Sequence, residues 1–483
     1  MIDRRLQPSL RFSGNGPGAL AGPGPGDGPG AAGQPGAPEA GTRGRLLARG
    51  EAVTLDLEGD PVPAFRGETV AVALFASGAR ALSRSLKYHR PRSFFCLAGH
   101  CGACLMRIDG RPNVKACQTP CSDGLRVASQ NAWPSAEHDA FGVVDWLFPR
   151  GMDHHHMFTG SRAMNAVLRK VTRQMSGLGR LPDPRPGNVR PETPPLRRLA
   201  GASAPDVLVV GAGPAGLAAA TAAARAGARV LGIDDGAVPG GSLLADPGHG
   251  LAAAASSVRE ARAAGAEVRA ASPMIGYFPE DGGGLAAIRT PDALWLVQPR
   301  TTIYATGGYD QNALFEDNDR PGVISGRAAG RLLVRFGVRP ARRAVVAGDA
   351  PYAAALAAEL AAAGITVTRT PRVQRAHGRA WVSAATLADG SRVTCDLIAV
   401  CETPAPASEP ARQHGCAVTL QPARGGFCID TDAAGLTSLP GVFACGDVTG
   451  YQGPDAAALD GARVGAAAAA AASAARAREA ATP

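Results

Sequence analysis

The stretch DVLVVGAGPAGLAAATAAARAGARVLGIDD (residues 206–235) predicts the fold of the larger part of the chain. It has the pattern of a buried strand, a G-x-G-x-x-G turn, an Ala-rich helix and a second strand that ends in acidic residues. In such a turn Gly211 permits the tight bend, Gly213 admits a pyrophosphate, and Gly216 lets helix and strand pack closely. Free N–H groups at the start of the helix favour the negative phosphates. The predicted dinucleotide contacts are Gly211, Gly213, Pro214, Ala215 and Gly216, with Asp235, or its neighbour Asp234, on the ribose hydroxyls.

Three further segments indicate which dinucleotide binds. TTIYATGG (301–308) is a predicted strand that ends in the Ala-Thr-Gly turn of flavoproteins with two dinucleotide sites, and GVFACGDVTG (441–450) is similar to their late motif. In that motif Asp447 would hold the ribityl or pyrophosphate part of a flavin. A Pro-Gly-Gly segment after the acidic strand is typical of the same class. Four motifs in this order predict FAD rather than NAD, with further contacts at Gly240, Gly241, Ala305, Thr306, Gly307, Gly446 and Asp447.

A second segment of this type, AVVAGDAPYAAALAAELAAAGITVT (344–368), is degenerate. Its glycine pattern becomes Gly348-x-Ala350-x-x-Ala353, and Arg369 stands where an acidic residue is usual. Ala350 would crowd a pyrophosphate. Two interpretations stay open: weak binding of NAD(P), with an arginine on a 2′-phosphate, or a structural domain without nucleotide. We favour the structural domain.

Four cysteines have the spacing C-x4-C-x2-C-x12-C: Cys96, Cys101, Cys104 and Cys117. Thiolates are the ligands of iron–sulfur clusters, and C-x4-C-x2-C is the plant-type [2Fe–2S] spacing. Gly99 and Gly102 lie between the cysteines and permit positive φ, so that backbone N–H groups can turn toward the sulfurs. The alternatives are a structural zinc site and thiols without metal. Zinc sites usually have two C-x2-C pairs, and here the second pair is missing.

The segments around these cysteines suit a small β-grasp domain. Residues 53–65 alternate apolar and polar residues around a Gly-Asp pair, as a hairpin does, and residues 67–78 carry apolar residues at helical spacing. Cys121 is predicted to be a bystander, although it could compete for the fourth ligand position. The remaining cysteines are isolated in apolar segments and are predicted core residues: Cys395, Cys401, Cys416, Cys428 and Cys445. Without a second C-x2-C pair, thioredoxin-reductase chemistry is disfavoured.

The composition of the chain argues against several classes of protein. The 483 residues carry a net charge of +9, but nearly all the basic residues are arginines scattered along the chain, which argues against nucleic-acid binding. No run of about 18 apolar residues predicts a membrane span, and no apolar segment follows Arg4 and Arg5 as in a secretory signal. Together with the cysteine pattern, this predicts a cytoplasmic location. The side chains of His154, His155 and His156 diverge, so we predict a solvated or partner-facing loop there.

The pattern of segments predicts an α/β fold: a β-grasp ferredoxin-like N-terminal domain followed by a two-dinucleotide-binding, Rossmann-like flavoprotein domain. Residues 1–50 form an arm and a disordered Gly/Pro-rich linker. Residues 51–131 form the [2Fe–2S] domain, and 132–204 a helical and loop bridge. Residues 205–340 are the first part of the FAD-binding domain, 341–435 an inserted degenerate NAD(P)-like domain, and 436–483 the return to the FAD-binding domain with a C-terminal helix.

Residues 67–96, 129–147 and 305–333 together resemble the alpha subunits of heteromeric sarcosine oxidase. They also resemble the related subunits of proline, hydroxyproline and opine dehydrogenases and of hydrogen cyanide synthase. The resemblance covers residues 51–475 and implies a [2Fe–2S] domain fused to an FAD-dependent pyridine-nucleotide-disulfide-type domain. Sarcosine oxidase alpha subunits usually lack the cluster cysteines and continue into a folate-binding half. This chain has the cysteines and ends at Pro483, so both departures indicate the dehydrogenase branch.

In that family the amine is oxidised at a flavin on a separate beta subunit, and the alpha subunit passes electrons onward. The resemblance therefore implies an oxidoreductase subunit acting on CH–NH groups, a beta-subunit partner, and a quinone, a carrier protein or oxygen as acceptor. The absence of a convincing general base beside the flavin motifs agrees with this, so catalytic residues stay unassigned. Two alternatives are an NAD(P)H-dependent reductase that feeds a monooxygenase or ferredoxin, and a redox-inactive scaffold subunit.

Overall fold

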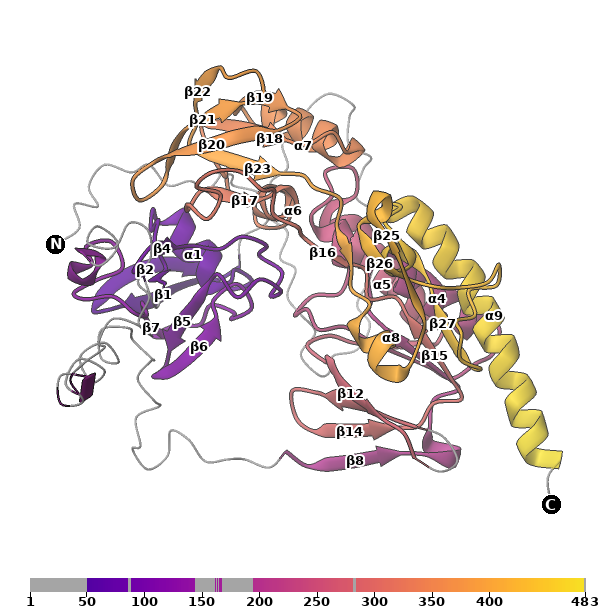
Figure 1. Cartoon of the computed structure of the whole chain (residues 1–483). Coiled ribbons are helices and arrows are strands. Elements are labelled where there is room, and N and C mark those ends of the chain that lie inside the picture. Colours follow the sequence, from indigo (N-terminus) through magenta and orange to yellow (C-terminus); the bar gives the residue numbers. More distant parts are fainter. Residues whose placement is uncertain are drawn as a thin grey trace, which may run out of the picture.

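The computed structural model describes residues 50–85, 88–143, 194–280 and 284–481, together with a few positions between 161 and 166. The N-terminal arm and the run His154, His155 and His156 lie outside the described residues. The described part is mixed α and β, as the sequence predicts (Figure 1).

The N-terminal domain is a five-stranded mixed sheet with one buried helix. The strands lie in the order β2 (Asp60–Phe65), β1 (Ala52–Leu57), β7 (Arg126–Ala128), β5 (Leu105–Ile108) and β6 (Arg111–Lys115). The β1–β2 hairpin closes through Glu58 and Gly59, both at positive φ, which is the geometry that matches strand twist. All residues of α1 (Val70–Ala76) are buried beneath the sheet, and β3 (Ser83–Arg84) pairs with β4 (Pro91–Arg92) at its side.

The first dinucleotide-binding half has a parallel sheet in the order β11 (Glu267–Arg269), β10 (Val230–Ile233), β9 (Val207–Val210), β15 (Thr301–Tyr304) and β27 (Val442–Ala444). Helices α4 (Pro214–Arg225), α5 (Gly250–Ala263) and α9 (Pro454–Ala481) cover it. A side chain at Gly461 or Gly465 of α9 would overlap the carbonyl oxygens of Ala215 and Ala219 on α4. The late C-terminal helix therefore packs closely on the helix that follows the glycine turn.

A smaller sheet flanks this half, in the order β12 (Met274–Phe278), β13 (Leu285–Arg289), β14 (Leu294–Val297) and β8 (Leu196–Leu199). Short elements complete the first half. Strand β16 (Gly308–Tyr309) pairs with β24 (Ala405–Pro406). Strand β25 (Val418–Gln421) pairs with β26 (Gly426–Ile429) and follows α8 (Glu409–His414). The 3-10 turns are η1 (Ala140–Gly142), η2 (Gly201–Ser203), η3 (Gly241–Leu244), η5 (Pro422–Arg424) and η6 (Gly446–Thr449).

The second half has its own parallel sheet, in the order β17 (Val323–Ser325), β23 (Leu397–Val400), β18 (Arg343–Ala347) and β19 (Thr366–Thr370). Helix α6 (Gly326–Gly330) follows β17 and continues as the π-helical segment η4 (Arg331–Arg335), and α7 (Pro351–Ala362) follows β18. An antiparallel sheet lies next to these elements: β20 (Val373–Gly378), β21 (Val382–Leu387) and β22 (Arg392–Thr394).

The N-terminal domain is docked firmly on this second half. In Figure 1 the indigo domain lies beside β17 with α1 and β4 on that side, and one hydrophobic core runs through both parts. The Phe75 ring lies 6.0 Å from the Trp381 ring, and the Arg80 guanidinium stacks 4.7 Å above Trp381. The Ser325 N–H donates to the carbonyl oxygen of Phe95 at 3.0 Å. Apolar burial and backbone hydrogen bonding thus fix the position of the cysteine-bearing domain.

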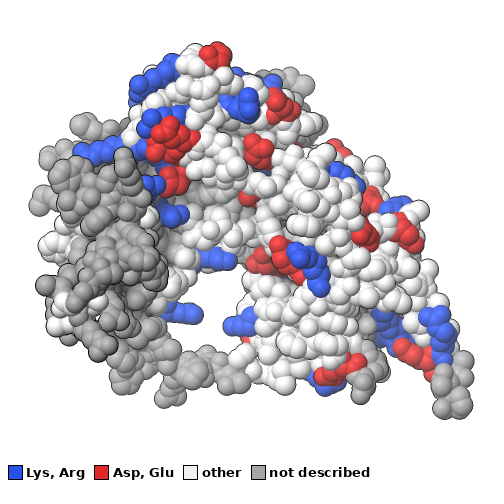
Figure 2. Space-filling model, in the orientation of Figure 1, with Lys and Arg blue, Asp and Glu red and all other residues white. Residues whose placement is uncertain are grey.

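On the face shown in Figure 2, arginine and lysine side chains alternate with aspartate and glutamate instead of covering one element. Within the described ranges, no helix is long and apolar enough to cross a bilayer.

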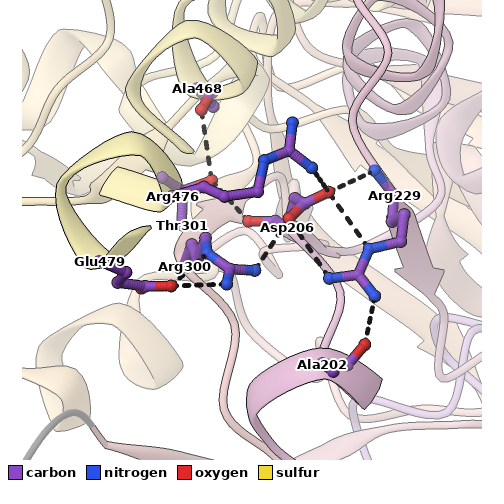
Figure 3. A network of polar contacts seen from close by, with 8 residues as sticks. All are labelled: Ala202, Asp206, Arg229, Arg300, Thr301, Ala468, Arg476 and Glu479. Atoms are coloured by element: carbon purple, nitrogen blue, oxygen red, sulfur yellow. Dashed lines mark hydrogen bonds and ion pairs between the residues drawn. The ribbon is translucent and has the colours of Figure 1, made fainter. Parts of the chain in front are cut away.

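Asp206 joins the start of β9 to the far end of α9 (Figure 3). Its side chain is 3% exposed and receives Arg300 at 2.9 Å, Arg229 at 3.4 Å and Arg476 at 3.5 Å. Its Oδ2 also accepts the backbone N–H of Arg229 at 2.9 Å. Burial alone would raise the pKa of Asp206, but the hydrogen bonds and charge of Arg229, with Arg476, hold it below the usual value.

Substituting Asp206→Ala is expected to lower the free energy of unfolding by about 3–5 kcal/mol, because three guanidinium groups lose a buried anion. Denaturant unfolding at neutral pH measures this. Because the folded-state pKa is depressed, the contribution is present above the unfolded pKa and disappears as pH falls below about 4. The control is Glu479→Ala, the exposed end of the same network, with an expected loss under about 1 kcal/mol. Equal, small losses in both variants would contradict this role for Asp206.

Candidate functional site

A cavity of about 400 Å³ lies between the N-terminal domain and the carboxyl ends of the first parallel sheet. The predicted FAD residues that line it come from four separate motifs: Gly211, Gly213, Pro214, Ala215, Asp234, Asp235, Gly241, Ala305, Thr306, Gly307 and Asp447. Three predicted residues support the wall from behind. Gly216 packs on Gly211, Gly446 on Ala215, and Gly240 on Ala254.

The glycine turn has the geometry that a pyrophosphate requires. Gly211 has φ +102°, and a Cβ there would overlap the carbonyl oxygen of Ala305. A Cβ on Gly241 would lie 2.8 Å from the Cα of Gly213. Gly213 is the N-cap of α4, so the open N–H groups of the first helical turn face this space. The residues therefore fit a dinucleotide, because a side chain would fill the cradle.

The structure separates the roles of the two neighbouring acids. The Asp234 carboxylate accepts the N–H groups of Ala212 at 2.7 Å and Gly236 at 2.9 Å, so it braces the glycine turn. Burial and the charge of Asp235 raise the pKa of Asp234 to about 6. The Asp235 side chain is 61% exposed, and its Oδ2 lies 3.7 Å from Nε2 of His100. Of the two, Asp235 has room for a ribose.

In the two later flavoprotein motifs, the side chains of Asp447 and Thr306 form hydrogen bonds with backbone groups. Oδ1 of Asp447 accepts the N–H groups of Gln452 at 3.0 Å and Gly453 at 3.2 Å. The Thr306 hydroxyl donates to the carbonyl oxygen of Ala407 at 2.7 Å, so its side chain braces the loop and its backbone is left for the cavity.

The four motif cysteines lie in two pairs: Cys96, Cys101 and Cys104 are on the loop before β5 (the cysteine loop), and Cys117 follows β6. Cys101 hydrogen-bonds to Cys96, and Cys117 to Cys104, which lowers the pKa of Cys96 and Cys104 relative to a free thiol. Backbone N–H groups also turn toward sulfur, from Ala98 to Cys96 at 3.4 Å and from Ala103 to Cys101 at 3.5 Å. Gly99 and Gly102, at φ +84° and +65°, permit this loop path.

The pairing fits two metal ions better than one. In a [2Fe–2S] cluster with four cysteine ligands, each iron binds two thiolates. The four cysteines of this chain are arranged in two such pairs. Cys121 is buried on the same segment, where its N–H donates to the carbonyl oxygen of Glu68.

The cysteine loop also forms a wall of the dinucleotide cavity, which the sequence analysis did not foresee. The wall consists of Leu97, Ala98 and His100 of this loop, with Cys117 and Gln118 from the segment after β6. The His100 ring packs edge-on against Tyr309 at 4.9 Å between ring centroids. Three arginines of α6 and η4 complete the lining: Arg327, Arg331 and Arg335. Their four-residue spacing is the one signal in the sequence that indicates a common helix face.

In the second dinucleotide-binding half, the crevice at the expected ligand position is nearly closed. This crevice lies beyond the carboxyl ends of β18 and β23, where an α/β sheet normally binds its ligand, and encloses only about 20 Å³. Tyr352 fills this position and donates to the carbonyl oxygens of Ala245 at 2.9 Å and Gly326 at 3.2 Å. That volume suits about one water molecule.

Comparison with known families agrees with this arrangement. Residues 50–132 match the 2Fe-2S iron-sulfur cluster binding domain, 206–263 the FAD dependent oxidoreductase family, and 338–475 the pyridine nucleotide-disulphide oxidoreductase family. The predicted fold class and the two predicted cofactors, FAD and a [2Fe–2S] cluster, are thereby confirmed. The match over 50–132 also decides against zinc.

Among characterised proteins, the sarcosine oxidase subunit alpha of Rhizobium meliloti is 32% identical over 348 residues, which cover 67% of this chain and 34% of that subunit. The hydrogen cyanide synthase subunit HcnA of Pseudomonas aeruginosa is 43% identical over 79 residues, 16% of this chain and 75% of that subunit. The chain thus spans about a third of the sarcosine oxidase subunit. The structure of L-proline dehydrogenase from P. horikoshii has a TM-score of 0.65 at 21% identity, covering 87% of this chain and 74% of that one, and supports the fold.

Proposed function

Because the chain belongs to the family of heteromeric sarcosine oxidase alpha subunits and their dehydrogenase and hydrogen cyanide synthase relatives, we propose that it is the electron-transferring subunit of an amine-oxidising complex. The substrate is a secondary amine or imino acid of the sarcosine, proline, hydroxyproline or opine type, oxidised at a flavin on a beta subunit. One observation carries the proposal: the cysteine loop is a wall of the FAD cavity, so both redox groups share one site.

The proposal assigns the residues as follows. Cys96 and Cys101 hold one iron, and Cys104 and Cys117 hold the other. The backbone around Gly211 and Gly213 binds the pyrophosphate, Asp235 the ribose, and Asp447 the ribityl or pyrophosphate side of FAD. When bound, FAD supplies two-electron chemistry and the cluster one-electron transfer. The chain's own contribution is to place the two groups against one cavity.

The acids around the cavity support oxidation of the amine on the partner. Asp234 and Asp447 already accept backbone N–H groups, and Oε2 of Glu68 accepts the N–H of Phe65 at 3.1 Å. Asp235, the exposed acid, lies beside His100 at the ribose position. These carboxylates act in binding and bracing, and the proposal assigns proton removal from the amine to residues of the beta subunit.

Co-purification with a beta subunit tests this function. The isolated chain is expected to reduce an artificial electron acceptor negligibly with sarcosine, proline, hydroxyproline or an opine, and the reconstituted complex is expected to do so with at least one of them. Robust amine-dependent reduction by the chain alone would contradict the proposal. So would a complete complex that passes no amine-derived electrons to this chain's cofactors.

The NAD(P)H-dependent reductase is the second candidate, and the closed crevice at Tyr352 argues against it. Anaerobic addition of NADH or NADPH to the purified chain is expected to leave the visible absorption of FAD unchanged, because the crevice beside α7 encloses only about 20 Å³. Dithionite, as the control, is expected to bleach it fully. Rapid bleaching by either nucleotide would favour the reductase and make this chain the entry point of electrons.

A further inference from the structure

Helix α6 and segment η4 carry a row of three arginines along the cofactor cavity. Arg327, Arg331 and Arg335 are spaced four residues apart and all line the cavity between the FAD motifs and the cysteine loop. The row continues into a π-helical turn, a rare conformation that is frequent at functional sites.

Among the described residues, one carboxylate forms ion pairs with this row. Asp310, 5% exposed, pairs with Arg327 and, at 3.4 Å, with Arg331, and the same two arginines keep the pKa of Asp310 low despite its burial. Arg331 also donates to the carbonyl oxygen of Cys96 at 2.8 Å, which ties the row to the cysteine loop. One carboxylate thus serves two guanidinium groups.

Arg335 has no carboxylate partner among the residues that the structure describes. Its guanidinium carbon lies 4.7 Å from the centroid of the Phe336 ring. The Arg331 guanidinium repels its charge, and the Cys117 sulfur attracts it. Burial and this repulsion lower the pKa of Arg335 to about 10, which leaves it charged at neutral pH. Arg335 lines the same cavity as Cys117, a proposed ligand of the cluster.

A cluster held by four thiolates is negatively charged, and accepting one electron makes it more so. A fixed positive charge nearby stabilises the reduced form more than the oxidised one. We propose that Arg335 raises the reduction potential of the cluster on this chain, so that reduced FAD gives one electron and the oxidised cluster gains it. Arg335 acts through Cys117 and is a positioning residue, not a catalytic one. This inference rests on the proposed function.

The test is a redox titration of the anaerobically purified full chain, with the cluster followed by electron paramagnetic resonance and the FAD by absorption. Arg335→Gln is expected to lower the equilibrium constant for cluster reduction about tenfold, which corresponds to about 59 mV for a one-electron couple. Arg335→Lys keeps the charge and is expected to restore most of the potential. Arg342→Gln is the matched control: it removes the same charge from an exposed position outside the cavity and leaves the potential unchanged.

The outcomes are distinguishable. A wild-type chain without cluster signal overturns the proposed function itself. A wild-type cluster whose potential is the same in Arg335→Gln overturns only the role of Arg335. If Arg335→Gln assembles no cluster, Arg335→Met, which keeps an unbranched stem for Phe336, replaces it. Loss of the cluster in both neutral variants but not in Arg335→Lys supports a charge role, whereas loss in all three assigns Arg335 to packing and overturns the proposal.

Discussion

Replacing Cys104 by alanine is expected to remove both irons and to leave FAD bound. Cys104 is 1% exposed and pairs with Cys117, so its loss leaves one iron of the proposed cluster with a single thiolate. A [2Fe–2S] cluster needs four ligands. Iron and sulfide analysis of anaerobically purified protein is expected to change from a full cluster per chain to nearly none, and the cluster's paramagnetic signal after reduction is expected to disappear.

FAD is expected to remain because its phosphate and ribose contacts come from another sheet. The empty loop still forms a wall through Leu97, Ala98 and His100, so weaker FAD binding, by less than about tenfold, is compatible with the shared cavity. The control is Cys121→Ala, the buried neighbour outside the proposed ligand set, which is expected to keep its iron. Loss of iron from Cys121→Ala, or retention in Cys104→Ala, would refute the ligand assignment.

Replacing Gly211 by alanine is expected to give a folded chain with at least about tenfold less FAD. Gly211 has φ +102°, and its new Cβ would overlap the carbonyl oxygen of Ala305. Overpacking of this kind costs about 1–3 kcal/mol, and the left-handed backbone adds strain for a residue with a side chain. The turn must shift to relieve the overlap, and it is the same turn that presents N–H groups to the pyrophosphate. Flavin released per chain, and the affinity of the apoprotein for added FAD, measure the effect.

Gly227→Ala separates the overlap from the strain. Gly227 lies beyond the other end of α4 at φ +83°, but nothing lies within 4 Å of an added Cβ. This variant is expected to lose only about 1 kcal/mol of stability and to retain full FAD. Equal FAD content in Gly211→Ala and Gly227→Ala would show that close approach at Gly211 has no part in binding.

Features that depend on neighbouring residues could be predicted from the sequence. The alternation over 53–65 and the helical spacing over 67–78 correspond to the β1–β2 hairpin and α1, and the 206–235 pattern corresponds to β9, α4 and β10. The order of the four flavoprotein motifs and the spacing of the cysteines correctly predicted both cofactors. Each of these signals is local, because turn geometry and side-chain periodicity are set within a few residues.

Contacts between segments that are far apart in the sequence could not be predicted from the sequence. Asp234 and Asp235 are adjacent in the sequence, and only the fold shows that one braces the turn while the other faces the cavity. Tyr352 looked like an ordinary helical residue, yet it closes the second crevice by bonding to Ala245, 107 residues away. Long-range packing of this kind produces no periodic pattern in the sequence, so it cannot be predicted from one.

The sequence alone determined the fold class and the two cofactors, since short motifs encode them. Only the tertiary structure showed that the cysteine loop and the FAD turn face one cavity, with Arg335 beside Cys117. The physical reason is that one apolar core spans the N-terminal domain and the second half, from Phe75 to Trp381. That packing decides which surfaces meet, and hence how the two cofactor sites are arranged.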